Sequence, residues 1–181
     1  HLPVQSGSTK ILKNMNRGHT IEEYLNVIDR LKRNKFNIKF SSDFIIAYPG
    51  ETNEDFQKTL DLLNDIKFIN SYSFVFSERP GTPAASMPKV DKKIAKERLS
   101  IFQNQANFLK TIYRKQLINS KAKVLFENQV KNQNTYFGRD EYFNSVIVKS
   151  NLNLRGKILT VKINECNNNT LFGEILDNNY Q

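Results

Sequence analysis

Three short loops rich in Gly, Pro and Ser follow apolar runs in the first half of the chain, and they constrain its fold more than any other feature. They occupy residues 1–8, 43–52 and 76–85. In a barrel of parallel strands, the loops after the strand carboxyl ends carry the chemistry, and these residue types let a backbone turn sharply around a ligand. We therefore expect the three loops to form one rim of a binding site.

Helices and strands alternate between these loops. Thr20 and Glu23 form a capping box at the start of an amphipathic stretch, and Thr52 has the residue type of a second helix cap. The predicted elements are a helix over residues 20–34, a buried strand over 38–48, a helix after Thr52 and an alternating strand over 71–77. This order predicts right-handed crossovers and a parallel α/β sheet in residues 1–90.

A long basic helix is predicted over residues 91–117, with Asp91 as its cap. Its apolar residues recur at alternating intervals of four and three, which is typical of a helix that docks on a neighbouring body. They are Ala95, Leu99, Phe102, Ala106, Leu109 and Tyr113.

Residues 118–181 have a different texture, with short β-rich runs between turns that carry Asn and Gly. The runs cover residues 124–126, 145–149, 158–163 and 171–176. This pattern predicts a separate small antiparallel barrel or sandwich, with a domain boundary near residue 118.

The formal net charge of +9 is concentrated in the predicted linking helix. Residues 91–117 carry 7 Lys and Arg against 2 Asp and Glu, compared with 12 against 10 in residues 1–90 and 8 against 6 in residues 118–181. A basic helix of this kind suits a phosphate backbone, because each neutralised phosphate releases a counterion. A solvated face rich in Lys is the alternative.

The single cysteine, Cys166, excludes an internal disulfide and a metal centre held by cysteines of this chain alone. His1 and His19 lack the spacing of metal ligands. The chain has neither an apolar stretch long enough to span a membrane nor the pattern of a secretory signal in its first residues. These features predict a cytoplasmic protein without a membrane partner.

Polar residues at the strand ends are candidates for ligand contacts. Period two places Asp43 and Ile45 on one face of their strand, and Gln5, Ser6 and Ser8 form a polar cluster at another strand-to-helix junction. Asp43 either contacts a ligand or satisfies neighbouring backbone or basic groups. Ser8 is equally suited to cap a short helix that reaches Met15.

Four stretches together resemble the radical S-adenosylmethionine methylthiotransferases: HLPVQSGS at residues 1–8, MNRGHT at 15–20, SSDFIIAYPGETNEDF at 41–56 and YSFVFSERPGTPAA at 72–85. The combination is most similar to the branch that acts on isopentenyladenosine beside the tRNA anticodon. A non-catalytic RNA-binding module and the threonylcarbamoyl-adenosine branch are the alternatives. The resemblance implies part of a TIM-like radical barrel in residues 1–90, a linking helix in 91–117 and an OB-like TRAM barrel in 118–181.

The resemblance also implies cofactors. The family uses S-adenosylmethionine and two 4Fe-4S clusters held by cysteines to insert sulfur at carbon 2 of the adenine, with an electron donor and a sulfur source as partners. The family's cysteine motifs have no counterpart here, so this chain is expected to be the C-terminal part of such an enzyme and inactive alone. The residues implied at S-adenosylmethionine are Gln5, Ser6, Asp43, Ile45, Pro49, Gly50 and Glu51, and those near adenosine or substrate are Arg79, Pro80, Gly81 and Thr82.

In the predicted TRAM barrel, the resemblance implies that basic and aromatic side chains bind tRNA. The candidates are Lys123, Lys131, Tyr136, Phe137, Arg139, Arg155 and Lys157. Ala47 and Tyr48 stand where the family more often has Gly and Phe, so the backbone at Ala47 is expected to approach a ligand less easily.

Overall fold

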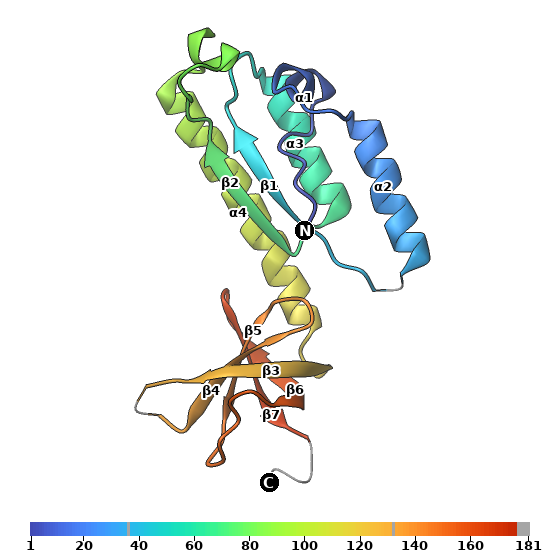
Figure 1. Ribbon diagram of the computed structural model, residues 1–181, viewed down its shortest axis with the longest axis vertical. Coiled ribbons are helices and arrows are strands. Elements are labelled where there is room, and N and C mark those ends of the chain that lie inside the picture. Colours follow the sequence, from blue (N-terminus) through green and yellow to red (C-terminus); the bar gives the residue numbers. More distant parts are fainter. Residues whose placement is uncertain (36, 132, 177–181) are drawn as a thin grey trace. The chain divides into compact units, whose positions relative to one another are not determined.

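Alternating helices and strands build the first half of the structure, a computed structural model that describes residues 1–35, 37–131 and 133–176 (Figure 1). The chain divides into two compact units, one covering His1–Lys110 and the other beginning at Thr111. The elements of the first unit are α1 (Thr9–Asn14), α2 (Ile21–Asn34), β1 (Ser41–Ile46), α3 (Asn53–Ile66), β2 (Asn70–Val75), η1 (Pro83–Ser86) and most of α4 (Lys92–Gln116). The division between the units falls inside α4.

Side-chain caps fix where the helices begin, as the sequence predicts. The Thr20 hydroxyl accepts a hydrogen bond from the Glu23 amide, and the Glu23 carboxylate accepts one from the Thr20 amide. Thr52 and Asp55 make the same reciprocal pair at the start of α3. Each pair satisfies two amides that a helix start leaves without partners.

Parallel pairing joins three extended segments. β1 and β2 run parallel, with Asp43 opposite Tyr72 in the register. Residues 2–5 run along the other edge of β1, where the Gln5 amide donates to the Asp43 carbonyl at 2.9 Å and the Ile45 amide donates to the Gln5 carbonyl at 2.9 Å. The predicted parallel arrangement is confirmed, and the carboxyl ends of the three segments lie at one edge.

Helices α2, α3 and α4 cover one face of this sheet. Phe44 is fully buried there, with its ring centroid 5.5 Å from that of Phe68 and 4.7 Å from that of Phe102 in α4. The opposite face is open, since Tyr72 and Phe74 on β2 are 53% and 62% exposed. None of the described helices is long and apolar enough to cross a membrane.

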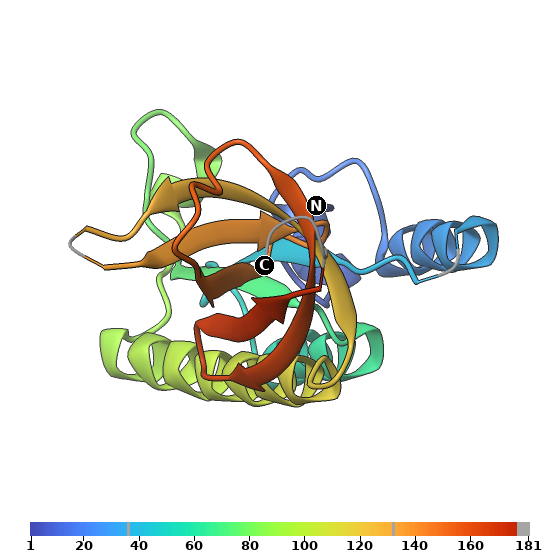
Figure 2. The same cartoon turned by 90° about the horizontal axis from the view of Figure 1, so that it is seen from below.

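The second unit is a closed five-stranded barrel. Its strands are β3 (Lys121–Gln129), β4 (Thr135–Asp140), β5 (Ser145–Lys149), β6 (Ile158–Cys166) and β7 (Thr170–Ile175). They close in the order β3-β4-β5-β7-β6, with β5 and β7 parallel and the other pairs antiparallel. In Figure 2 these strands, in orange and red, curve around one interior. The predicted barrel is confirmed.

The sequence-based prediction missed β4, because Gly138, Arg139 and Asp140 dilute its apolar pattern. Gly138 is required in this strand: a Cβ atom there would lie 2.5 Å from the Leu125 carbonyl oxygen of β3. The barrel core consists of alternate residues of the strands, including Val124, Phe126, Val146 and Val161.

Gly7 shows how closely the first strand-end loop packs on α3. A Cβ atom at Gly7 would lie 2.3 Å from the Lys58 carbonyl oxygen, whereas one at Gly18 would meet nothing within 4 Å. We expect Gly7→Ala to destabilise the first unit by about 2 kcal/mol through overpacking against helical backbone. Gly18→Ala is the matched control, and equal urea midpoints for both variants would contradict this account.

Candidate functional site

A groove of about 780 Å³ lies at the carboxyl ends of the parallel strands, and we name it the strand-end groove. It is lined by residues 14–17, by Ile45 and Tyr48, and by residues 74–84 except Glu78, Pro80 and Gly81. Two of the three predicted loops, 43–52 and 76–85, contribute to this lining, together with the residues that follow α1; no residue of the loop at residues 1–8 lines the groove. The volume is typical of a site for a small organic ligand or cofactor.

Tyr48 connects these loops. Its hydroxyl donates to the Asn14 carbonyl at 2.9 Å, and its ring centroid lies 5.0 Å from that of Phe76, edge to face. Tyr48 also packs with Ile11 and Ala84 in a small apolar cluster. This residue therefore holds α1, the β1–α3 loop and the segment after β2 together.

Asp43 and Ile45 lie on the open face of the sheet, away from the helices, as predicted. The Asp43 side chain is 35% exposed and lies 3.5 Å from Nε2 of His1, while the His1 ring is 6.1 Å from that of Tyr72. Ser73 on β2 is paired with Phe44, whose side chain points to the opposite face of the sheet.

Two backbone positions beside the groove adopt left-handed conformations. Gln5 has φ = 77° and Ala47 has φ = 59°, values that favour glycine. The left-handed backbone at Ala47 gives a physical reason why glycine suits that position. Ala47 is nevertheless tolerated, and its amide donates to the Glu51 carboxylate at 3.1 Å.

Two predicted cofactor contacts have protein partners instead. Ser6 is 1% exposed and accepts a hydrogen bond from the Ser8 amide, with its hydroxyl 3.5 Å from that of Thr59 in α3. Glu51 is 5% exposed and forms an ion pair with Arg98 of α4 at 2.8 Å. Burial raises the pKa of Glu51, and the charge of Arg98 opposes that rise.

The other predicted contacts lie in turns. Gly50 has φ = 81° in the tight turn after Tyr48 and Pro49, where the Glu51 amide donates to the Tyr48 carbonyl at 2.9 Å. Among residues 79–82, Arg79 and Thr82 line the groove, and the Thr82 hydroxyl donates to the Arg79 carbonyl at 2.8 Å. Pro80 and Gly81 form the exposed tip of this turn.

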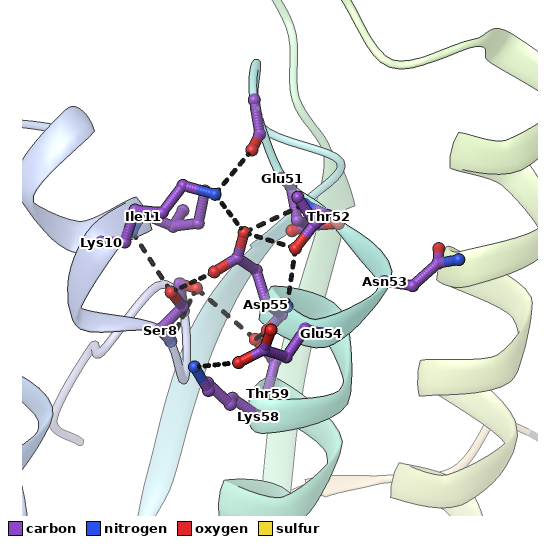
Figure 3. A network of polar contacts seen from close by, with 12 residues as sticks. Ser8, Lys10, Ile11, Glu51, Thr52, Asn53, Glu54, Asp55, Lys58 and Thr59 are labelled. Carbon is purple, nitrogen blue, oxygen red and sulfur yellow. Dashed lines mark hydrogen bonds and ion pairs between the residues drawn. The ribbon is translucent and has the colours of Figure 1, made fainter.

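A second polar network holds the start of α3 against α1 (Figure 3). Asp55 is 4% exposed and accepts hydrogen bonds from Ser8 Oγ at 2.7 Å, Lys10 Nζ at 2.6 Å and Thr52 Oγ1 at 2.8 Å. Burial by itself would raise the pKa of Asp55, but these donors outweigh it and hold the pKa well below its usual range. The carboxylate at the N-terminus of α3 is therefore supplied by the protein itself, through Asp55.

Sequence reasoning missed the roles of Arg98, Asp55 and Lys10. Arg98 and Asp55 are charged residues at positions that their helices bury, and a charge within an apolar stripe is the signal that could have singled out Arg98. Within the described residues, no cluster of three or more His, Cys, Asp or Glu side chains could hold a metal ion.

Several predicted RNA-binding residues gather on one outer surface of the barrel. Leu125 is paired with Arg139 on β4 and with Ile158 on β6, and Lys123 stands two residues before it on β3. Leu125 and Ile158 are 43% and 66% exposed. We name this surface the β3–β4–β6 face; Lys157 is half-buried and precedes Ile158 in the segment that leads into β6.

Arg139 is held in place on this face. Its guanidinium carbon lies 5.3 Å from the centre of the Phe137 ring, and its Nε lies 3.3 Å from the Glu127 carboxylate. The exposed Arg155 precedes Lys157 in the loop before β6. A cation stacked on a ring is the type of group that contacts bases and phosphates.

Two other predicted RNA contacts lie elsewhere. Tyr136 is 5% exposed and packs in the barrel core, so its ring cannot stack on a base, and that prediction is wrong. Its neighbour Phe137 points outward because side chains alternate along a strand. Lys131 is exposed in the turn between β3 and β4, beyond the end of β3.

Comparison with known proteins agrees with this architecture. Residues 1–63 match the Radical SAM superfamily, and residues 115–176 match the TRAM domain. The first match covers residues 2–5, β1 and most of α3, and the second covers the barrel strands. The chain thus combines radical SAM sequence with a TRAM domain.

Individual relatives give a more specific comparison than the two family matches. The tRNA-2-methylthio-N(6)-dimethylallyladenosine synthase of Pelagibacter ubique is 50% identical over 177 residues, which are 98% of this chain and 40% of the relative. The synthases of the same name from Rickettsia rickettsii and Rickettsia canadensis are 44% and 45% identical, over 97% of this chain and 40% of each relative. The chain is therefore similar to the C-terminal part of these synthases and spans about 40% of their length.

The Asp55 network predicts a pH-dependent stability. Because its pKa is lower in the folded chain than the value of about 3.9 in unfolded peptides, Asp55 stabilises the fold above pH about 4, and this contribution is lost as pH falls through the folded-state pKa. We expect Asp55→Asn to destabilise the first unit by about 2 kcal/mol at pH 7 and by less at pH 3. Urea unfolding at both pH values measures this, with exposed Asp29→Asn as the control; an equal loss at both would refute it.

Proposed function

We propose that this chain is the C-terminal part of a tRNA methylthiotransferase that adds a methylthio group to carbon 2 of isopentenyladenosine next to the anticodon. The strand-end groove carries this proposal, since three of the four stretches that resemble the family contribute residues to its lining. The names of the relatives support the choice of substrate. The proposed partners are tRNA, an electron donor and a sulfur source, in the cytoplasm.

The open face of the sheet supports a role as part of a parallel, TIM-like barrel. Tyr72 and Phe74 are large and exposed, yet they lie on the face that a closed barrel would turn inward. In the proposed enzyme, further strands from the part of the relatives that this chain does not match complete the barrel. Asp43 would then lie inside, near the carboxyl ends of the strands.

The groove has the chemical character that S-adenosylmethionine needs. Ile45, Tyr48 and Phe76 offer an apolar wall for an adenine, while Asp43 and the backbone of Gln5 lie on the adjoining open face. S-adenosylmethionine, when bound to a reduced 4Fe-4S cluster, supplies the radical for hydrogen abstraction. Ser6 and Glu51 would act indirectly, by holding the loops through Thr59 and Arg98.

The clusters do not fit the residues of this chain. Fe-S clusters need several cysteine thiolates, and the one cysteine, Cys166, lies at the end of β6 in the barrel. In the proposed enzyme, the ligands of both clusters come from the part of the relatives that this chain does not match. The role of the groove is therefore to bind and orient S-adenosylmethionine and the adenine.

A chimera tests the catalytic proposal. This chain, joined to the unmatched part of the Pelagibacter ubique relative, should convert isopentenyladenosine in tRNA to its 2-methylthio derivative, measured by nucleoside mass spectrometry. Asp43→Ala in the chimera should weaken S-adenosylmethionine binding about tenfold and leave tRNA affinity within about twofold, the loss expected for a contact to a charged group. Asp29→Ala, on the exposed side of α2, is the control. A folded chimera with bound clusters and no product would overturn the assignment.

A second test addresses the barrel. We propose that the β3–β4–β6 face binds the tRNA backbone, so that affinity of the 181-residue chain falls steeply with salt. Replacing Arg139 or Lys157 with Ala should weaken binding and reduce the log-log salt slope by about 0.7 to 0.9 for each phosphate that is no longer neutralised. Lys32→Ala in α2 should change neither quantity. Unchanged affinity in both barrel variants would exclude this face.

A further inference from the structure

The turn between β4 and β5 presents an aromatic ring to solvent. Phe143 is 73% exposed, more than any other large hydrophobic side chain among the described residues. Its backbone has φ = 61°, in the left-handed region. A bulky residue rarely adopts this conformation, because its Cβ crowds the backbone.

Buried hydrogen bonds hold the turn in this shape. The Asp140 carboxylate, 7% exposed, accepts from the amides of Tyr142 at 2.9 Å and Asn144 at 2.8 Å. The Asn144 side chain, 2% exposed, donates to Asp140 at 2.8 Å and to the Tyr113 hydroxyl at 3.3 Å. The Phe143 amide donates to the Asp140 carbonyl at 3.0 Å. The backbone at Phe143, and with it the point from which the ring projects, is therefore set before any ligand arrives.

Neither the exposure nor the strain of Phe143 stabilises the barrel. Glycine would adopt the same backbone without the steric cost, and a polar side chain would suit the solvent better. Strained residues that the surrounding structure holds in place cluster at binding sites. Phe143 thus has the properties of a residue kept for a contact outside the chain.

We propose that Phe143 is a stacking platform for an unpaired nucleobase of the RNA that the barrel binds. The inference rests on the proposed RNA-binding function, and it adds a contact that reads an unstacked base instead of a phosphate. The one charged residue exposed in the turn, Glu141, is acidic and disfavours a phosphate at the ring, whereas a nucleobase is a neutral aromatic group that can stack there. Arg139 is paired with Ser145, which directly follows Asn144, so the platform borders the β3–β4–β6 face.

Stacking and phosphate contacts differ in their response to salt, and this difference tests the inference. Binding of the 181-residue chain to an RNA stem-loop, and to a duplex of the same stem without the loop, is measured across a salt series. Phe143→Ala should weaken binding to the stem-loop about tenfold, the size of one base–aromatic stack, with an unchanged salt slope and no effect on the duplex. Phe143→Trp should retain the affinity, and Leu152→Ala, another exposed apolar residue of the barrel, is the control.

Thermal unfolding separates this role from a structural one. Phe143→Gly should bind the stem-loop as weakly as Phe143→Ala while melting at the same temperature as the parent chain or a few degrees higher, because the strain is relieved. If Phe143 variants bind normally while Arg139→Ala binds weakly, the stacking inference is wrong and the RNA-binding function stands. If the parent chain binds neither RNA, both fail. A lower melting temperature for Phe143→Gly with normal binding would assign Phe143 a structural role.

Discussion

Parallel pairing of three extended segments is the constraint on which the first unit depends. Residues 2–5, β1 and β2 all run in one direction, so their carboxyl ends meet at one edge. Each connection must return across the sheet, and α2 and α3 make these crossings on the face that Phe44 buries. The same pairing gathers the loops that form the strand-end groove. Fold and candidate site therefore have a single physical origin.

The buried charged side chains of the first unit hold its loops in place. Glu51 and Arg98 form an ion pair in which both side chains are almost completely buried. The Asp55 carboxylate accepts hydrogen bonds from the side chains of three residues. A buried carboxylate is tolerated only when such partners replace its water. Asp43, by contrast, keeps about a third of its side-chain surface exposed on the open face. Among these carboxylates, Asp43 remains the one accessible to a ligand.

Along the barrel strands, side chains alternate between the core and the outer surface. Tyr136 enters the core while Phe137 and Arg139 point outward, so adjacent residues of β4 belong to the core and to the surface that we propose binds RNA. Gly138 between them lets β3 approach closely. At the end of the same strand, Asp140 fixes a turn that exposes Phe143. The short strand β4 thus contains a core residue, Tyr136, and an Arg139 guanidinium stacked on the Phe137 ring, and it ends at the residue that holds the next turn, Asp140.

Local signals in the sequence determined the helix starts at Thr20 and Thr52, the parallel order of the first unit and the barrel of the second, because caps, periodicity and turn residues act over a few neighbours. The placement of Asp43 and Ile45 on one strand face followed from period two. Only the tertiary structure decided that Glu51 is paired with Arg98, that Ser6 lies against Thr59 and that Tyr136 is buried. These outcomes depend on which distant residue lies opposite, a choice made by packing and by the partner that a buried polar group must find.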